Sequence, residues 1–382
     1  MEFAFTEEQK MIQQAARDYA QRELIKDVLE RDATATYPTQ HVKALAELGF
    51  MGMLVDAKYD GGGMDTVSYV LAMEEISKID SSVSVIMSVN NSLVCYGIEA
   101  FATEEQKGKW LKPLARGEKI GAFLLSEPEA GSDATSQRTT AEDKGDHYLV
   151  NGTKNWITNG NSASTYLVIA QTNPEKGHKG INVLLVDRHS PGITLGPHED
   201  KMGMRSSDTH SVMFNDVIVP KENRIGEDGF GFKFAMKTLE GGRIGIAAQA
   251  LGIAQGAFER AVKYSKERKA FGTEIFNHQS VAFKLAEMHT KIEAARLFCL
   301  KAAWLKDQHQ PYGTASAIAK YWAAETAMWV TTEAVQIHGG YGYVREYHVE
   351  RLMREAKLTQ IYEGTSEIQQ IIISRAIFNE VY

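Results

Sequence analysis

The chain has 382 residues, of which 43% are hydrophobic and 24% are charged, and its formal net charge is −7. This length exceeds a usual single core, so we expect two or three packed domains, and the balanced composition excludes a disordered chain. The acidic charge argues against nucleic acid or an anionic membrane surface as the main partner, although local Arg and Lys leave room for a polyanionic ligand.

The N-terminus begins with a helix capping box at Thr6 and Gln9, not with a basic region and an apolar run. No stretch approaches the length of a membrane span, so we expect a cytoplasmic protein, or one already processed, with no membrane partner. Cys95 and Cys299 lie far apart, and neither they nor the histidines show metal-ligand spacing. The sequence therefore predicts no disulfide framework and no metal site.

From Thr6 to about Arg116 the apolar residues recur at helical intervals, with a second capping box from Thr103 to Gln106. After Gly117 the pattern changes to short runs rich in β-branched and aromatic residues. These runs are Ala122–Leu125, Tyr148–Val150, Tyr166–Ala170, Val183–Val186 and Val212–Val219. Asn151-Gly152 follows the second run, and this dipeptide predicts a β-hairpin turn.

From about Gly229 the helical period returns in three long segments, and a fourth helix ends the chain. Four such helices predict an antiparallel four-helix bundle, and helices followed by strands and then helices predict separate layers. We therefore predict an α+β multidomain fold. Its parts are an N-terminal all-α domain (1–118), a middle antiparallel β domain (119–228) and a C-terminal helical bundle (229–382).

Residues 361–369 place one carboxylate, Glu363, on a Gly turn ahead of the last helix. Ser366 and Gln369 are spaced as a capping box, which predicts that the helix begins there. Backbone N–H groups and the helix dipole would lower the pKa of Glu363, whereas apolar surroundings would raise it. On spacing alone, Glu363 is either a candidate base or an ordinary acidic residue at a helix N-terminus.

Familiar nucleotide and hydrolase motifs are absent, because the chain has no GxxxxGK[ST] and no GxSxG. The segment 125–133 instead offers small hydroxyls and backbone N–H groups at Ser126, Gly131 and Ser132. It can hold a heteroaromatic edge or a pyrophosphate, or it can be a polar turn. Trp156, in the segment 156–160, is either a flat ligand platform or an ordinary core residue.

Taken together, these segments resemble the acyl-CoA dehydrogenase family over essentially the whole chain. The matching motifs are LSEPEAGSD (125–133), WITNG (156–160), KMGMRSSDT (201–209), RKAFG (268–272) with Gln279, QIHGGYG (336–342) and IYEGTSEIQ (361–369). The resemblance implies non-covalent FAD, an acyl-CoA thioester substrate, a homotetramer and an electron-transfer flavoprotein as the electron acceptor. In this family a glutamate at the position of Glu363 takes the α-proton and the flavin N5 accepts the β-hydride, which yields a trans-2-enoyl-CoA.

The resemblance also implies binding residues. Those for FAD are Phe123, Leu125, Ser126, Gly131, Ser132, Trp156, Ile157, Thr158, Arg268, Phe271, Gln279, Gln336, Ile337, Gly339, Gly340, Thr365, Ser366 and Glu367. Those for the substrate are Ser132, Glu240, Gly241, Gly242, Arg243, Tyr362 and Gly364. In this family Arg268 and Gln279 would reach FAD across a subunit interface.

Some branches, including isovaleryl-CoA dehydrogenases, carry the base directly before the arginine that matches Arg243. This chain has Gly242 there, which selects Glu363 and points to the short-chain and short-branched-chain branches. Residues 85–93 look most like the butyryl-CoA type. Residues 81–100 contain no Lys or Arg to pair with a distal carboxylate, which disfavours glutaryl-CoA.

Several alternatives remain open at this stage. Within the fold they are a 2-methylbutyryl- or isobutyryl-CoA dehydrogenase, an oxidase, and an enoyl-CoA reductase in the physiological direction. From a different class, a non-catalytic flavoprotein scaffold would keep the fold without the reaction. A DNA-associated flavoprotein is disfavoured by the acidic charge and the lack of a basic tail.

Overall fold

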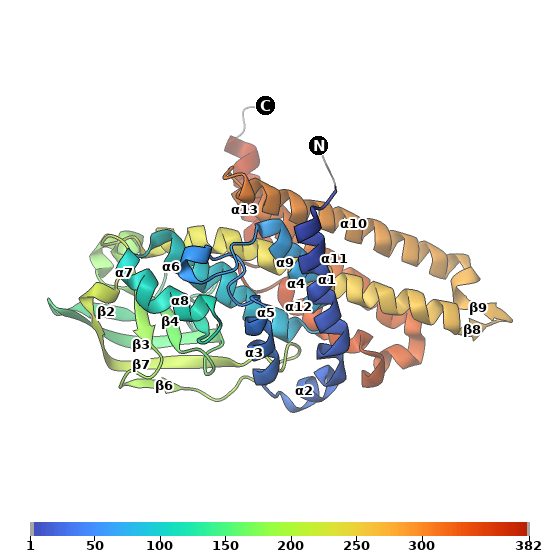
Figure 1. Cartoon of the computed structure of the whole chain (residues 1–382), viewed down its shortest axis with the longest axis horizontal. Helices are drawn as coiled ribbons and strands as arrows, with labels where there is room; N and C mark the ends of the chain where they lie inside the picture. Colours follow the sequence, from blue (N-terminus) through green and yellow to red (C-terminus); the bar gives the residue numbers. More distant parts are fainter. Residues whose placement is uncertain (1–3, 380–382) are drawn as a thin grey trace.

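A computed structural model describes residues 4–379 of the chain. Figure 1 shows the β sheet at one end of the molecule and the long C-terminal helices extending to the other, with some N-terminal helices over the middle and others beside the sheet. The predicted order of helical, β and helical layers is confirmed. No helix in the described part is both long and apolar enough to cross a membrane.

The N-terminal part is helical throughout. Its helices are α1 (Glu7–Arg22), α2 (Val28–Thr34), α3 (Thr39–Glu47), α4 (Thr66–Ser77), α5 (Ser81–Ser88), α6 (Tyr96–Phe101), α7 (Glu104–Gln106) and α8 (Lys112–Ala115). Both predicted capping boxes form, at Thr6 with Gln9 and at Thr103 with Gln106. Every residue of α4 is buried, because α4 packs against α1 on one side and the C-terminal helices on the other. A π-helical stretch, Val89–Cys95, joins α5 to α6.

The middle part is one twisted sheet in the order β1-β4-β2-β3-β7-β6, with β5 paired to β4. The strands are β1 (Gly121–Leu124), β2 (Thr140–Asp143), β3 (His147–Thr158), β4 (Thr165–Gln171), β5 (Ile181–Asp187), β6 (Ile193–Leu195) and β7 (Thr209–Pro220). Most pairings are antiparallel, whereas β1 runs parallel to β4. All five predicted runs lie in or overlap strands.

The hairpin predicted at Asn151-Gly152 is wrong. Both residues lie inside β3, where the register with β7 shifts between Val150 and Gly152. Gly152 has φ +140°, and a Cβ there would collide with Thr139. The glycine therefore serves a β-bulge and a close approach to a neighbouring segment, and not a turn.

The C-terminal part contains α9 (Gly231–Glu267), α10 (Gln279–Asp307), α11 (Gly313–His338), α12 (Val349–Thr359) and α13 (Ser366–Asn379), with the short strands β8 (Lys269–Ala270) and β9 (Thr273–Glu274). Helices α9, α10 and α11 pack on one another as predicted, and α13 packs on α11. The sequence did not predict α12, which packs between α9 and α11. Cys95 and Cys299 are buried and unbridged.

Candidate active site

Glu363 lies on the connection between α12 and α13, residues 360–365, which we call the Glu363 loop. Two successive residues adopt left-handed conformations, with φ +52° at Glu363 and +91° at Gly364. Such a conformation is unfavourable for a non-glycine residue and persists only where surrounding contacts hold it. Here Gln369 Nε2 donates to the Gly364 carbonyl at 2.9 Å, and Lys320 Nζ donates to the same carbonyl at 2.7 Å.

The cap of α13 differs from the predicted one. The backbone N–H of Ile368 donates to Thr365 Oγ1 at 3.3 Å, so Thr365 caps the helix, one residue before the position predicted. Ser366 is already helical, and its hydroxyl donates to Glu325 Oε1 at 2.7 Å. The predicted capping box of Ser366 and Gln369 is therefore wrong, because Gln369 turns back to the Glu363 loop.

The carboxylate of Glu363 is excluded from solvent and has no hydrogen-bond partner in the described residues. We expected orphan backbone N–H groups to surround it, and that expectation is wrong. Burial raises the pKa of Glu363 to about 7, against the opposing charges of Lys320 and Arg243. A carboxyl group that is buried, unpartnered and half-ionised near neutral pH has the properties of a proton acceptor.

Gly242, on α9, lies directly beneath this carboxylate. A Cβ at Gly242 would overlap Glu363 Oε2 and would also crowd Leu93. Position 242 and the Glu363 carboxylate therefore compete for the same space. Glycine is required because the carboxylate approaches the α9 backbone closely.

Two cations lie near Glu363. Arg243 is 6% exposed, forms no ion pair in the described residues, and has an Nε without a partner. Lys320, on α11, is fully buried, and burial lowers its pKa to about 8, with Glu363 acting in the opposite direction. Lys320 was not among the residues predicted from the sequence. The available signal was one cation among buried small residues, with Ala319 beside it and Ala323 and Ala324 in the next turn.

The face of α9 that carries Gly242 also carries a hydrogen-bonded amide, that of Gln249. Gln249 lies seven residues along the helix, about 10 Å away, on the same face. Its side chain donates to the Ser81 carbonyl and to Ser84 Oγ, each at 2.9 Å, and its oxygen accepts from the Tyr362 hydroxyl. Tyr362, predicted to contact the substrate, thus joins the Glu363 loop to this amide.

The predicted ligand segment of the β domain is fastened by a buried ion pair. Lys154 on β3 is fully buried, and its Nζ donates to Glu127 Oε1 at 2.8 Å and to the Leu125 carbonyl at 3.0 Å. Glu127 also accepts from the backbone N–H groups of Arg138 and Thr139. Gly131 and Ser132 lie exposed at the tip of the same loop, and Phe123, Leu125 and Ser126 are half-buried at its base.

Lys154→Met is expected to destabilise the protein by about 3–5 kcal/mol, because it leaves the Glu127 carboxylate buried without its cation. Urea unfolding, followed by circular dichroism, measures the loss. The matched control is Lys221→Met, which breaks an exposed pair with Asp143 and should cost less than about 1 kcal/mol. Equal losses for the two variants would contradict the assignment.

Trp156 is not a core residue. It lies in β3 where the register with β7 shifts between Lys154 and Ile157, it has φ +60°, and 61% of it is exposed. The bulge turns the indole outward, which leaves a flat aromatic surface open to a ligand. Ile157 is 2% exposed and packs in the β core, so only its backbone can reach a ligand, whereas Thr158 is half-buried.

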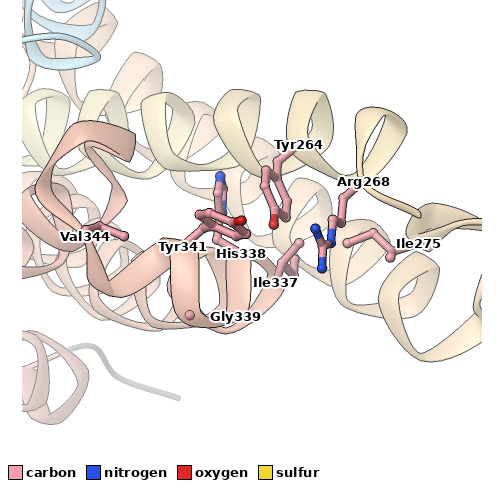
Figure 2. A pocket seen from close by; sticks show the side chains of 9 residues that line it. Tyr264, Arg268, Ile275, Ile337, His338, Gly339, Tyr341 and Val344 are labelled. Atoms are coloured by element: carbon pink, nitrogen blue, oxygen red, sulfur yellow. The ribbon is translucent and has the colours of Figure 1, made fainter. Parts of the chain in front are cut away.

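A second group of predicted residues lies at the far end of the C-terminal helices. Arg268, Ile337, Gly339 and Gly340 line a cavity of about 430 Å³ together with Tyr264, Ile275, His338, Tyr341 and Val344. Figure 2 shows Tyr264 and Arg268 pointing from one helix toward Ile337 and His338. The guanidinium of Arg268 lies 5.6 Å from the Tyr341 ring centroid and has no ion pair among residues 4–379. Gln279 and Gln336 are exposed, as is Phe271, at 99%.

The Arg268 cavity lies far from the Glu363 carboxylate within one chain. Gly242, which lies against that carboxylate, and Arg268, the C-cap of α9, are 26 residues apart in number and therefore roughly 39 Å apart along the helix axis. The chemistry nevertheless fits FAD at both places. The exposed indole of Trp156 suits a flat ring, and the uncompensated guanidinium beside an open cavity suits a phosphate. The chain thus presents an exposed indole on β3 and, separately, a guanidinium beside the Arg268 cavity.

The chain was compared with known protein families, sequences and structures. Three family models match in order: the acyl-CoA dehydrogenase N-terminal domain over residues 6–118, the middle domain over 122–217 and the C-terminal domain over 229–378. The chain belongs to the acyl-CoA dehydrogenase family. A short-chain specific acyl-CoA dehydrogenase of Clostridium acetobutylicum is 49% identical over 378 residues, which cover 99% of this chain and 100% of the relative.

Two solved structures have nearly the same fold as this chain. The butyryl-CoA dehydrogenase of Megasphaera elsdenii has a TM-score of 0.98 and 47% identity, over 99% of this chain and 100% of that one. A chain from work on the electron transferring flavoprotein of Acidaminococcus fermentans and flavin-based electron bifurcation has a TM-score of 0.98 and 49% identity, with both chains fully covered. This protein is therefore an FAD-dependent acyl-CoA dehydrogenase, of the short-chain type by resemblance.

Proposed function

We propose that this acyl-CoA dehydrogenase oxidises butyryl-CoA and other short-chain thioesters to trans-2-enoyl-CoA, with Glu363 as the base that removes the α-proton. The main support is the carboxylate of Glu363, which is buried, has no hydrogen-bond partner in the described residues and lies against Gly242. Arg243 and Lys320 are the cations that act on it. The α-proton of a thioester is a weak acid, so a base with a raised pKa is better matched to it than an ordinary carboxylate.

The chain's own residues bind and orient the reactants in this proposal. Glu240, Gly241 and Arg243 on α9, with Ser132 and Gly364, hold the thioester, and the backbone N–H of Glu363 stabilises the developing enolate oxygen. The cofactor segments are those of the β domain, the N-terminus of α13 with Thr365 to Glu367, and the Arg268 cavity. When bound, FAD supplies the acceptor for the hydride from the β-carbon.

A pH profile tests the state of the base. Glu363 accepts a proton only when ionised, and its pKa is about 7. We therefore expect kcat/KM with butyryl-CoA to rise about tenfold per pH unit below pH 7 and to level off above it. Stopped-flow measurement of flavin bleaching from pH 5.5 to 9 provides the profile. A rate that stays flat down to pH 5.5 would contradict a base with a raised pKa.

Gln249 supports an upper limit on the length of the acyl chain. A chain extending from the thioester along the α9 face beyond Gly242 meets this hydrogen-bonded amide after about 10 Å, a distance that admits butyryl and hexanoyl chains but stops long ones. Displacing the amide would leave buried polar groups unpaired, which costs more than a methylene gains. Anaerobic flavin bleaching with butyryl-, hexanoyl-, isobutyryl-, 2-methylbutyryl- and glutaryl-CoA ranks the substrates. A faster reaction with hexanoyl- than with butyryl-CoA would contradict the proposed preference for butyryl-CoA.

The distance of the Arg268 cavity from Glu363 within one chain supports an oligomer in which the Arg268 cavity of one copy completes the flavin site of another. Large apolar side chains also remain exposed on α10, including Phe283 at 67%, Leu297 at 52% and Trp304 at 54%. Exposed apolar surface of this kind marks protein–protein contacts. We propose a homotetramer, which sedimentation of the FAD-loaded enzyme tests. A monomer that retains FAD would contradict it.

We further propose that an electron-transfer flavoprotein accepts the electrons, in a cytoplasmic setting. The runners-up are a short-branched-chain dehydrogenase, an oxidase, or an enoyl-CoA reductase in the physiological direction. Slow reoxidation of the bleached flavin in air would argue against an oxidase, and fast reoxidation only with the partner flavoprotein would support the main proposal. A non-catalytic scaffold predicts no bleaching with any acyl-CoA.

A further inference from the structure

Lys320 is a buried cation that has no role in the reaction proposed above. It lies in α11 with no exposed surface, and its Nζ forms one hydrogen bond in the described residues, to the Gly364 carbonyl at 2.7 Å. An ammonium group has three donors, and its desolvation is costly. Packing alone does not require a lysine here, because a methionine has similar volume and no charge.

The contact of Lys320 joins the Glu363 loop to α11. Gly364 follows Glu363 in the left-handed part of the Glu363 loop, where both residues have positive φ. The ammonium of Lys320, on α11, donates a hydrogen bond to the Gly364 carbonyl. Gln369 Nε2, on α13, donates a hydrogen bond to the same carbonyl. The two donors therefore define where the Glu363 backbone lies over Gly242.

The charges that act on Lys320 come from the Glu363 loop and from helices α9, α11 and α13. Glu363 on the loop, Glu325 on α11 and Glu367 on α13 stabilise the ammonium, while Arg243 on α9 repels it. Glu363 contributes the largest of these attractions. Around Glu363 itself, the charged neighbours are Lys320 and Arg243, and the neutral hydroxyls of Tyr69 on α4 and Tyr362 complete the set of titratable groups.

We propose that Lys320 is a positioning residue for the reaction: its ammonium holds the Gly364 carbonyl, fixes the Glu363 loop over Gly242, and keeps the Glu363 carboxylate ionisable inside the protein. This inference rests on the proposed role of Glu363. It predicts two separable effects of Lys320, one on the position of the base and one on its charge state, because a cation in a low-dielectric site stabilises a nearby anion strongly.

Three variants separate these effects in the FAD-loaded enzyme. Lys320→Met removes both the charge and the donor, Gln369→Leu removes the other donor to the same carbonyl without changing the charge, and Lys320→Arg keeps the charge. Circular dichroism and flavin absorbance first establish that each variant is folded and loaded. The pH profile of flavin bleaching by butyryl-CoA then reports the ionisation of the base. Infrared difference titration, with Glu363→Gln as the reference, reports the carboxyl band independently of turnover, with and without FAD.

In Lys320→Met the loss of the cation raises the pKa of Glu363, so the acidic limb should move upward by about one pH unit, a tenfold loss at pH 6. Gln369→Leu should lower the maximal rate of flavin bleaching at high pH without shifting the acidic limb of the pH profile. Lys320→Arg, which keeps the charge, should have an acidic limb closer to the native position than that of Lys320→Met. An unmoved limb and carboxyl band in folded Lys320→Met would overturn this inference while leaving Glu363 as the base. A Glu363→Gln enzyme that still bleached flavin would instead overturn the proposed function.

Discussion

Glu363→Gln is expected to slow flavin bleaching by butyryl-CoA by about four orders of magnitude, the upper end of what a positioned base contributes. The amide keeps the size and shape of the side chain but cannot take the α-proton. Because the carboxylate has no hydrogen-bond partner in the described residues, the substitution breaks no internal hydrogen bond. FAD binding and acyl-CoA binding should therefore persist, which equilibrium titration and flavin absorbance measure.

A control variant shows whether the rate falls because the base is lost or because any glutamate is replaced by glutamine. Glu7 on α1 is exposed and forms an i,i+3 pair with Lys10, so Glu7→Gln should keep the native rate. Glu363→Gln bleaching at a near-native rate would show that another group removes the proton. Loss of FAD from the variant would mean that the carboxylate supports the cofactor site instead.

Gly242→Ala is expected to reduce kcat by about 10²-fold, because its Cβ would occupy the space of Glu363 Oε2. A displacement of about 1 Å of a catalytic group costs that much in rate. Helix stability should not fall for reasons of backbone propensity, since alanine is favoured over glycine within a helix by about 1 kcal/mol. The measurement is the limiting rate of flavin bleaching at saturating butyryl-CoA.

The neighbouring glycine offers a matched comparison. A Cβ at Gly241 has its nearest neighbour, Lys306 Nζ, at 3.6 Å, which is ordinary contact. Gly241→Ala carries the same change in helix propensity without the collision. Because Gly241 is proposed to hold the thioester, its substitution is expected to act on KM, whereas the limiting rate at saturating butyryl-CoA should stay far above that of Gly242→Ala. Similar rates in the two variants would indicate that Glu363 does not rest on α9 as the structure describes.

The motifs predicted the order of the layers and the family correctly, because each motif is a local run whose identity does not depend on packing. Local rules failed where tertiary contacts override them. Asn151-Gly152 has the sequence of a hairpin turn, yet β7 continues to pair on both sides of it, so the extra residue becomes a bulge. Thr365, and not Ser366, caps α13 because Ser366 finds Glu325 as a partner.

From the sequence alone, the family resemblance linked position 363 with position 242, because family members carry the base at one of these two positions and this chain has a glutamate at 363 and a glycine at 242. Only the tertiary structure decided what surrounds that glutamate. The expectation that helix N–H groups would meet the carboxylate is replaced by burial against Gly242, near Arg243 and Lys320, which leaves its pKa near neutrality. Lys320 lies 43 residues from Glu363 in number. A pKa depends on the solvent and charge brought within a few ångströms, and those neighbours come from helices far apart in the chain.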